Sequence, residues 1–217
     1  MNTRKIRLYE DFDRDYAKRI EDTYIKANKL SGDKDEVLWF DDKAIDRYIE
    51  LLQFSTQGDK ILDFGCGLGI LASVTPAPNY MGVDVQDRFI KKCKEEYPSH
   101  NFKTIDNIND IDWTWDWFVA SGAFTTGFKD FSMLERTIDK AVEKSSRGVA
   151  FNFLVTRHKN QNAIFNYYLS QGVHYNLYNL SKMFQFFKSK YPDLRVVGKR
   201  SSASDVYDNE GIIYIIK

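Results

Sequence analysis

The chain has 217 residues, with 31 basic and 31 acidic side chains, 43% hydrophobic residues and 15% aromatic residues. This length allows one domain with a buried core, and the composition is that of a globular rather than a disordered protein. The balanced charge offers no overall field for nucleic acid or an anionic membrane, so neither partner is expected. Residues 1–30 lack the apolar segment of a secretory signal, no segment reaches membrane-span length, and the two cysteines form no metal-binding pattern. We therefore expect a cytoplasmic protein with reduced thiols and no bound metal.

Two amphipathic helices are expected before the first strand. Apolar side chains recur every three or four residues in Tyr9–Lys29, which predicts the first helix. A second helix is expected to begin at Asp41 or Asp42. Its apolar face would carry Ile45, Tyr48, Ile49 and Leu52. These helices would form a cap, residues 1–57, on a core of residues 58–217, the two together making a single domain.

Short apolar runs then alternate with helical segments, a pattern that predicts a parallel sheet with crossover helices. Strands are expected at Lys60–Phe64, Tyr80–Asp84, Asn101–Thr104, Trp117–Ser121 and Val149–Val155. Helices are expected at Leu68–Ser73, Asp87–Tyr97, Phe131–Lys144 and Leu180–Lys190. Near the C-terminus, Leu194–Val197 and Ile212–Ile216 flank a polar turn and predict an antiparallel hairpin at the sheet edge. The expected fold class is α/β, with a mostly parallel sheet of seven strands and helices on both faces.

Glycine occupies every second position of the loop after the first strand, at Gly65, Gly67 and Gly69. Glycines permit a tight turn and close approach of a ligand, and a helix that follows such a loop offers free N–H groups. Ile70 follows directly, so the spacing fits neither the dinucleotide pattern G-x-G-x-x-G nor a phosphate-binding loop with its lysine. Asp63 lies two residues before the first glycine, where a carboxylate would repel a pyrophosphate and attract an ammonium. S-adenosylmethionine, which carries an ammonium and a sulfonium but no phosphate, is therefore favoured over NAD.

The segment Asp63–Gly69 resembles motif I of class I S-adenosylmethionine-dependent methyltransferases. The resemblance continues at Tyr80–Asp84, a strand that ends in an acid fifteen positions after Gly69. It implies a Rossmann-like fold, S-adenosylmethionine as cofactor with S-adenosylhomocysteine as product, and an acid that binds the ribose hydroxyls. It covers about Leu38 to the end and extends to a subgroup of small bacterial, archaeal and phage methyltransferases without an established substrate.

The resemblance places cofactor contacts in the glycine loop and after the second, third and fourth strands. The expected cofactor-binding residues are Asp63, Gly65, Cys66, Gly67, Gly69, Asp84, Val85, Asp106, Asn107, Ser121 and Gly122. Asp106 and Asn107 stand where the family contacts adenine, but both residue types are also common in turns. Cys66 is expected to be a small filler whose backbone is the important part.

Motifs that are absent restrict the acceptor. Ser121–Phe124 stands where amino-methylating nucleic-acid enzymes carry a Pro-Pro loop, and neither cysteine follows a proline as in cytosine-C5 enzymes. The same loop provides no acidic ligands, so no bound Mg²⁺ is expected. We expect methyl transfer to a small-molecule acceptor by metal-free in-line displacement, in which positioning supplies much of the acceleration. The alternative is a non-catalytic S-adenosylmethionine-binding module within a larger assembly.

The pattern leaves the catalytic residues open. His158 follows the fifth strand and could serve as a general base, although a surface histidine in a loop is the more frequent case. Tyr178 is a second candidate. It belongs to a group of tyrosines that either contact the acceptor or cover the sheet as an apolar lid, namely Tyr167, Tyr168, Tyr175 and Tyr178.

Overall fold

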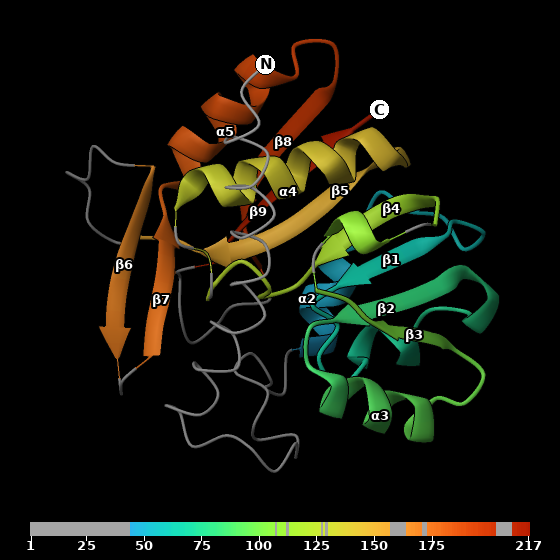
Figure 1. Ribbon diagram of the computed structural model, residues 1–217. Coiled ribbons are helices and arrows are strands. Elements are labelled where there is room, and N and C mark those ends of the chain that lie inside the picture. Colours follow the sequence, from blue (N-terminus) through green and yellow to red (C-terminus); the bar gives the residue numbers. More distant parts are fainter. Residues whose placement is uncertain are drawn as a thin grey trace, which may run out of the picture.

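The computed structural model describes residues 44–106, 108–111, 113–126, 128, 130–156, 164–170, 173–202 and 210–217. Its main feature is a seven-stranded sheet with the order β3-β2-β1-β4-β5-β9-β8 (Figure 1). The strands are β1 (Ile61–Phe64), β2 (Tyr80–Asp84), β3 (Asn101–Thr104), β4 (Trp115–Ala120), β5 (Ser145–Leu154), β8 (Arg195–Arg200) and β9 (Glu210–Ile216). The first five strands pair in parallel, whereas β9 pairs antiparallel with both β5 and β8. The predicted α/β fold and its C-terminal antiparallel pair are confirmed.

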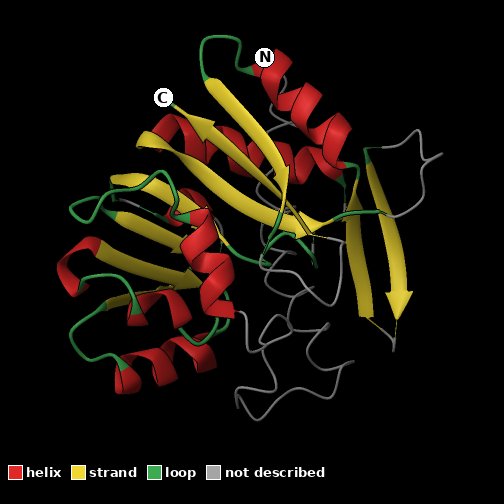
Figure 2. Cartoon of the chain, turned by 180° about the vertical axis from the view of Figure 1, so that it is seen from behind, coloured by secondary structure: helices red, strands yellow, loops and turns green. Residues whose placement is uncertain are grey.

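Helices cover both faces of this sheet (Figure 2). They are α2 (Ala44–Leu51), α3 (Asp87–Glu96), α4 (Phe131–Lys144) and α5 (Leu180–Lys190). Two of them begin at a side-chain cap, because Asp130 accepts a hydrogen bond from the backbone of Met133 and Asn179 accepts one from Lys182. These two, α4 and α5, have the bounds that the sequence predicts.

The sheet separates two apolar cores. Side chains alternate between the faces of a strand, so Leu62 and Phe64 of β1 pack in the core beneath α4 and α5. Ile61 faces the other way, into the core that includes Tyr48 of α2 and Ile90 of α3. Asp63, two residues after Ile61, lies on this second face. The sequence thus places a carboxylate inside a core, beneath the loop that follows β1.

Several element bounds differ from the predictions. The expected helix Leu68–Ser73 is a short 3₁₀ helix, η2 (Ile70–Ser73), and β4 begins two residues earlier than expected. Strand β5 begins at Ser145, directly after α4, and not at Val149. Its first residues are polar, which hides a strand from a search for apolar runs.

Helix α2 buries a different face from the one predicted. Ile45 and Ile49 are 42% and 56% exposed, whereas Arg47 and Glu50 are buried together with Tyr48. Long-range polar contacts favour this orientation, since residues of the C-terminal hairpin bind the buried carboxylate of Glu50. The predicted helix Tyr9–Lys29 and the expected start of this helix lie outside the described residues.

Glu50 joins α2 to the C-terminal hairpin. Its carboxylate accepts hydrogen bonds from the hydroxyls of Ser201 and Ser202 and pairs with Lys199 at 2.8 Å. Burial alone would raise the pKa of Glu50, but these hydrogen bonds and the ammonium lower it to about 2. Tyr214 of β9 also donates to the backbone carbonyl of Glu50. The helix is therefore held in place by residues more than 140 positions away.

A two-stranded hairpin, β6 (Phe165–Ser170) and β7 (Val173–Tyr178), lies beside the main sheet (Figure 1). The sequence pattern predicts no regular structure for this tyrosine-rich segment. The backbone of Asn176 donates to the carbonyl of Thr125, and Val155 forms an isolated bridge with Tyr178. The hairpin is thereby attached to the loop after β4 and to the end of β5.

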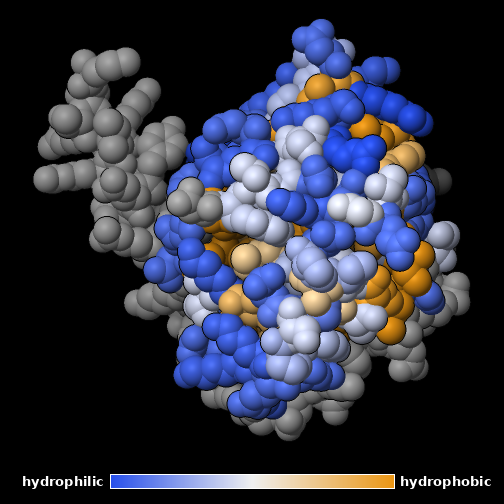
Figure 3. Space-filling view, turned by 90° about the vertical axis from the view of Figure 1, so that its right-hand side faces the viewer, coloured by the Kyte–Doolittle hydropathy of each residue, from blue (hydrophilic) through white to orange (hydrophobic). Residues whose placement is uncertain are grey.

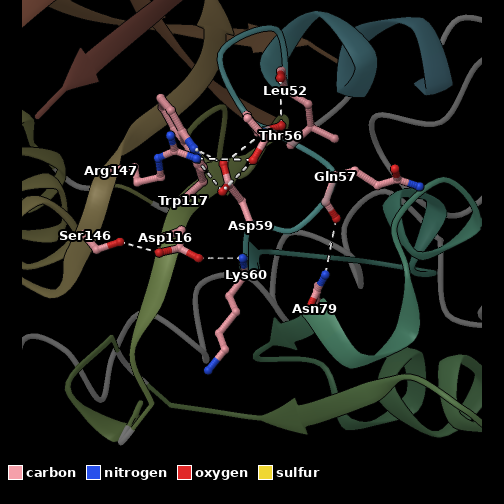
Figure 4. A network of polar contacts seen from close by, with 11 residues as sticks. Leu52, Thr56, Gln57, Asp59, Lys60, Asn79, Asp116, Trp117, Ser146 and Arg147 are labelled. Atoms are coloured by element: carbon pink, nitrogen blue, oxygen red, sulfur yellow. Dashed lines mark hydrogen bonds and ion pairs between the residues drawn. The ribbon is translucent and has the colours of Figure 1, made fainter.

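A polar network holds the amino ends of β1, β4 and β5 together (Figure 4). Asp59 accepts hydrogen bonds from the backbone and hydroxyl of Thr56, from the indole N–H of Trp117 and from Arg147. Burial would raise the pKa of Asp59, but these bonds and the charge of Arg147 lower it below its ordinary value. This network lies at the edge of the sheet opposite the glycine loop, so its role is structural.

The surface in Figure 3 is mostly hydrophilic, with smaller apolar areas between the polar side chains. Among the described residues, the exposed large apolar side chains are Ile45, Ile49 and Val74. No helix in this part of the chain combines the length and the apolar character needed to span a bilayer.

Candidate functional site

The glycine loop connects β1 to η2 and uses its own N–H groups internally. The amides of Gly65 and Cys66 both donate to the carbonyl of Val83 on β2, at 2.8 and 3.0 Å. The amide of Gly67 donates to Asp84, and that of Gly69 donates to the carbonyl of Cys66. The α-helix expected after this loop is a four-residue 3₁₀ helix, so its N-terminal anion site is absent there. Four of the loop amides are therefore already bonded within the protein.

Gly65 is required by both conformation and space. Its φ of 73° lies in the left-handed region, which side chains disfavour. A Cβ at this position would lie 2.7 Å from the Cβ of Ala123, in the loop after β4. The two loops that meet at the carboxyl edge of the sheet are thus in direct contact, which places Ser121 and Gly122 next to the glycine loop.

Asp63 is fully buried beneath this loop. Its Oδ2 accepts a hydrogen bond of 2.8 Å from the hydroxyl of Tyr80, whereas Oδ1 has no hydrogen-bond partner among the described residues. Burial raises the pKa of Asp63 to about 7; the bond from Tyr80 lowers it, and the neighbouring charge of Asp84 raises it. An unpartnered carboxylate oxygen in a core is costly, and a nearby cation would compensate it.

Asp84 ends β2 and connects that strand to the glycine loop. Its Oδ2 accepts from the amide of Gly67 and its Oδ1 from the amide of Gln86, both at 2.9 Å. Burial raises the pKa of Asp84 above its ordinary value, against the effect of these bonds. The next residue, Val85, is half-buried. Each carboxylate oxygen has a further lone pair, so the acid can still accept from a ligand hydroxyl.

The remaining predicted site residues have fewer contacts that connect them to the glycine loop. Asp106 is exposed after β3, and its amide donates to the carboxylate of Asp110 at 3.0 Å, as in a turn. Asn107 and His158 lie outside the described residues. Cys66 is a buried free thiol, as is Cys93, whose thiol donates to the carbonyl of Gly67. The described residues contain no group of three or more His, Cys, Asp or Glu side chains placed to hold a metal ion.

Asn152 extends the site along the carboxyl edge and is not among the residues expected from the sequence. Its side-chain oxygen accepts a 2.6 Å hydrogen bond from the amide of Gly122, and its amide nitrogen lies 3.4 Å from the hydroxyl of Ser121 and 3.5 Å from Glu210. Glu210 begins β9 and pairs with Arg47 of α2 at 3.7 Å. All five residues of this group are buried, namely Arg47, Ser121, Gly122, Asn152 and Glu210. A polar asparagine within the apolar run 149–155 was the sequence signal that could have revealed this residue. No local pattern marked Glu210 or Arg47.

Tyr178 occupies a core position and does not face an open site. It is fully buried between Phe153 and Phe165, and its hydroxyl donates to the carbonyl of Phe124 at 2.9 Å. This contact holds the loop after β4 and leaves the hydroxyl proton of Tyr178 bonded to a backbone carbonyl. Tyr175 is half-buried, while the side chains of Tyr167 and Tyr168 lie outside the described part.

Comparison with known proteins identifies the fold. No family model and no curated protein matches the sequence. A solved structure of the N-methyltransferase NodS from Bradyrhizobium japonicum WM9, in complex with S-adenosyl-L-homocysteine, is similar with a TM-score of 0.63 and 13% identity, over 89% of this chain and 97% of that one. The magnesium protoporphyrin IX methyltransferase ChlM from Synechocystis PCC 6803 with bound SAM gives 0.58 and 11% identity, over 80% and 77%. The DhpI-SAM-HEP complex gives 0.59 and 11% identity, over 99% of both chains. The chain therefore has the fold of class I S-adenosylmethionine-dependent methyltransferases.

Proposed function

We propose that the protein is an S-adenosylmethionine-dependent methyltransferase that acts on a small-molecule acceptor. The observation that carries the proposal is Asp63, a buried carboxylate with one oxygen unpartnered among the described residues, beneath a glycine loop that ends the first strand. A cationic cofactor compensates this charge, whereas the phosphates of NAD would be repelled by it. The internal hydrogen bonds of four loop amides support the same choice, because these amides are not free to bind a pyrophosphate.

Four groups of residues fit such a cofactor. Asp63 would attract its ammonium, Asp84 would accept from the ribose hydroxyls, and the loop around Gly67 would lie against it. Ser121 and Gly122 would border it on the side of β4, held by Asn152. When bound, the cofactor supplies a methyl group on a positively charged sulfur, which is already a strong electrophile.

The protein's own task in this chemistry is to orient the acceptor. Direct displacement on a sulfonium needs no Lewis acid, and the loop after β4 contains Ser121 and Gly122 where acidic metal ligands would be needed. The loop is fixed from two sides, by Asn152 at Gly122 and by the hydroxyl of Tyr178 at Phe124. A general base is needed only if the acceptor loses a proton as it is methylated, and His158 is the candidate for that role.

The names of the similar structures support methyl transfer as the reaction. One is called an N-methyltransferase, one a magnesium protoporphyrin IX methyltransferase, and both were solved with SAH or SAM. These names describe different acceptors, so they support the donor and leave the acceptor to be found by experiment.

Calorimetric titration with S-adenosylmethionine, S-adenosylhomocysteine and NAD⁺ tests the proposal. Micromolar binding of the first two ligands and no binding of NAD⁺ is expected. Binding of NAD⁺ alone, or no binding of any of the three ligands, would overturn the proposal. A screen of amine, hydroxyl and thiol acceptors that measures S-adenosylhomocysteine production then separates the enzyme from a binding module. Tight binding without product for any acceptor would favour the module.

A further inference from the structure

Tyr80 and Asp63 form a buried pair across two neighbouring strands. Asp63 of β1 lies opposite Gly82 in the parallel register, and Tyr80 precedes that glycine by two residues on the same face of β2. The tyrosine ring passes over Gly82, where an added Cβ would lie 2.7 Å from the Tyr80 hydroxyl and 2.7 Å from the ring of Phe102. Because Gly82 has no side chain, there is space for the hydroxyl of Tyr80 to reach Asp63.

The ring of Tyr80 is fixed independently of its hydroxyl. It makes edge contacts with His100 and Phe102, with centroids 5.6 and 5.5 Å apart, and it is fully buried. Its hydroxyl is therefore held at Oδ2 of Asp63 and leaves Oδ1 as the oxygen without a partner among the described residues. Such an arrangement orients the carboxylate and favours its ionised form.

We propose that Tyr80 is a positioning residue for the cofactor site, and that it keeps the Asp63 carboxylate ready to ionise so that binding of a cationic ligand releases a proton near neutral pH. This inference rests on the proposed function, because it takes S-adenosylmethionine as the ligand. The ligand's ammonium and sulfonium stabilise the charged form of Asp63, and the proton held by the free protein is lost to solvent.

Asp63 is surrounded by other titratable groups, and burial also raises the pKa of one of them, Asp84. Asp84 of β2 is the other nearby carboxylate, and its charge raises the pKa of Asp63. Tyr48 of α2, Cys66 of the loop and Tyr80 itself all face the pair, and burial is the main cause that raises the pKa of each above its ordinary value. The charge of Asp63 is the next cause for Tyr48 and Tyr80, whereas for Cys66 the hydrogen bond with Cys93 comes before the charges of Asp84 and Asp63. Burial therefore favours the neutral form of all three groups. Two nearby cations have the opposite effect. The charge of Arg47 lowers the pKa of Tyr48, and the charge of Arg88 lowers the pKa of Asp84.

The test is the pH dependence of cofactor affinity, measured by calorimetry between pH 6 and 9 in phosphate and in Tris, whose ionisation enthalpies differ. The wild type should lose affinity below about pH 7, by up to about tenfold per pH unit, with release of up to one proton per ligand bound. Tyr80→Phe keeps the ring and removes the bond that lowers the pKa of Asp63, so its transition should move to higher pH. Its affinity should be several-fold weaker at pH 7.5 and equal to the wild type at pH 9.

Two variants serve as controls. Asp63→Asn should bind weakly at every pH, with no proton release. Tyr97→Phe removes a hydroxyl from the same aromatic cluster, where Tyr97 contacts His100 and Phe102 but not Asp63, and should leave the curve unchanged. A Tyr80→Phe curve that matches the wild type, or that is lowered equally at all pH values, would refute the positioning role.

Failure of the proposed function would look different. If the wild type binds no S-adenosylmethionine, the donor assignment fails, yet a ¹³C-carboxyl NMR titration of the ligand-free protein still measures the effect of Tyr80 on Asp63. An unchanged Asp63 titration in Tyr80→Phe would then refute the pairing itself.

Discussion

Replacing Gly65 by alanine should damage both the fold and the cofactor site. The left-handed φ of 73° costs a non-glycine residue about 1–2 kcal/mol. The new Cβ would lie 2.7 Å from that of Ala123, well inside the optimal carbon–carbon contact, and relieving such an overlap costs about 1–3 kcal/mol. The free energy of unfolding should fall by about 2–5 kcal/mol, which lowers the melting temperature by roughly 5–15 °C for a chain of this size.

The ligand effect follows from the direction in which the loop must move. Separation of Gly65 from Ala123 shifts the glycine loop away from the loop after β4 and disturbs the bond from Gly67 to Asp84. Calorimetry should show at least about a tenfold loss of S-adenosylmethionine affinity, equivalent to about 1.4 kcal/mol. Gly58→Ala is the matched control, because nothing lies within 4 Å of a Cβ there; it should change stability by less than about 0.5 kcal/mol. A Gly65→Ala protein that melts and binds like this control would show that the contact with Ala123 does not shape the cofactor site.

Three other changes test different parts of the structure. Asp84→Ala should weaken cofactor binding and also lower stability by about 1–3 kcal/mol, because two buried backbone amides lose their acceptor; full affinity by calorimetry would contradict the assignment. Asp59→Ala leaves the indole N–H of Trp117 without its acceptor and should cost about 2–4 kcal/mol in urea denaturation, with cofactor affinity unchanged at the opposite sheet edge. The pKa of Glu50 is about 2 in the folded protein against 4.5 ordinarily, so its stabilisation is complete above about pH 4.5 and is lost as the pH falls toward 2; Glu50→Gln should lack this acid-dependent component, and an identical pH profile would show that the carboxylate does not anchor α2.

Local signals were sufficient for much of the fold. Helices α4 and α5 begin at Asp130 and Asn179, whose side chains cap them, so their bounds follow from sequence. The glycine loop and Asp84 were found because their chemistry is encoded in consecutive residues. Strands that consist of a short apolar run could be predicted for the same reason.

Features that depend on distant residues were not predictable in this way. The face that α2 buries is decided by Glu50, whose partners lie in the C-terminal hairpin. Asn152 becomes part of the site only because β4 and β5 are neighbours, which brings its side chain to Gly122. Tyr80 gave no local sign of its contact with Asp63, since their pairing requires the register of β1 and β2 and the space above Gly82.

The position of β9 has a consequence for the protein's synthesis. Strand β9 is inserted between β5 and β8, so residues 210–216 pair with a strand, β5, that is synthesised well before them. Until these residues leave the ribosome, the backbone of β5 is an unprotected strand edge, with Val149, Phe151 and Phe153 beside it. Such an edge pairs readily with other chains. A nascent chain that stalls before residue 210 should therefore depend on chaperones, and the last strand ends that dependence when it takes its place in the sheet.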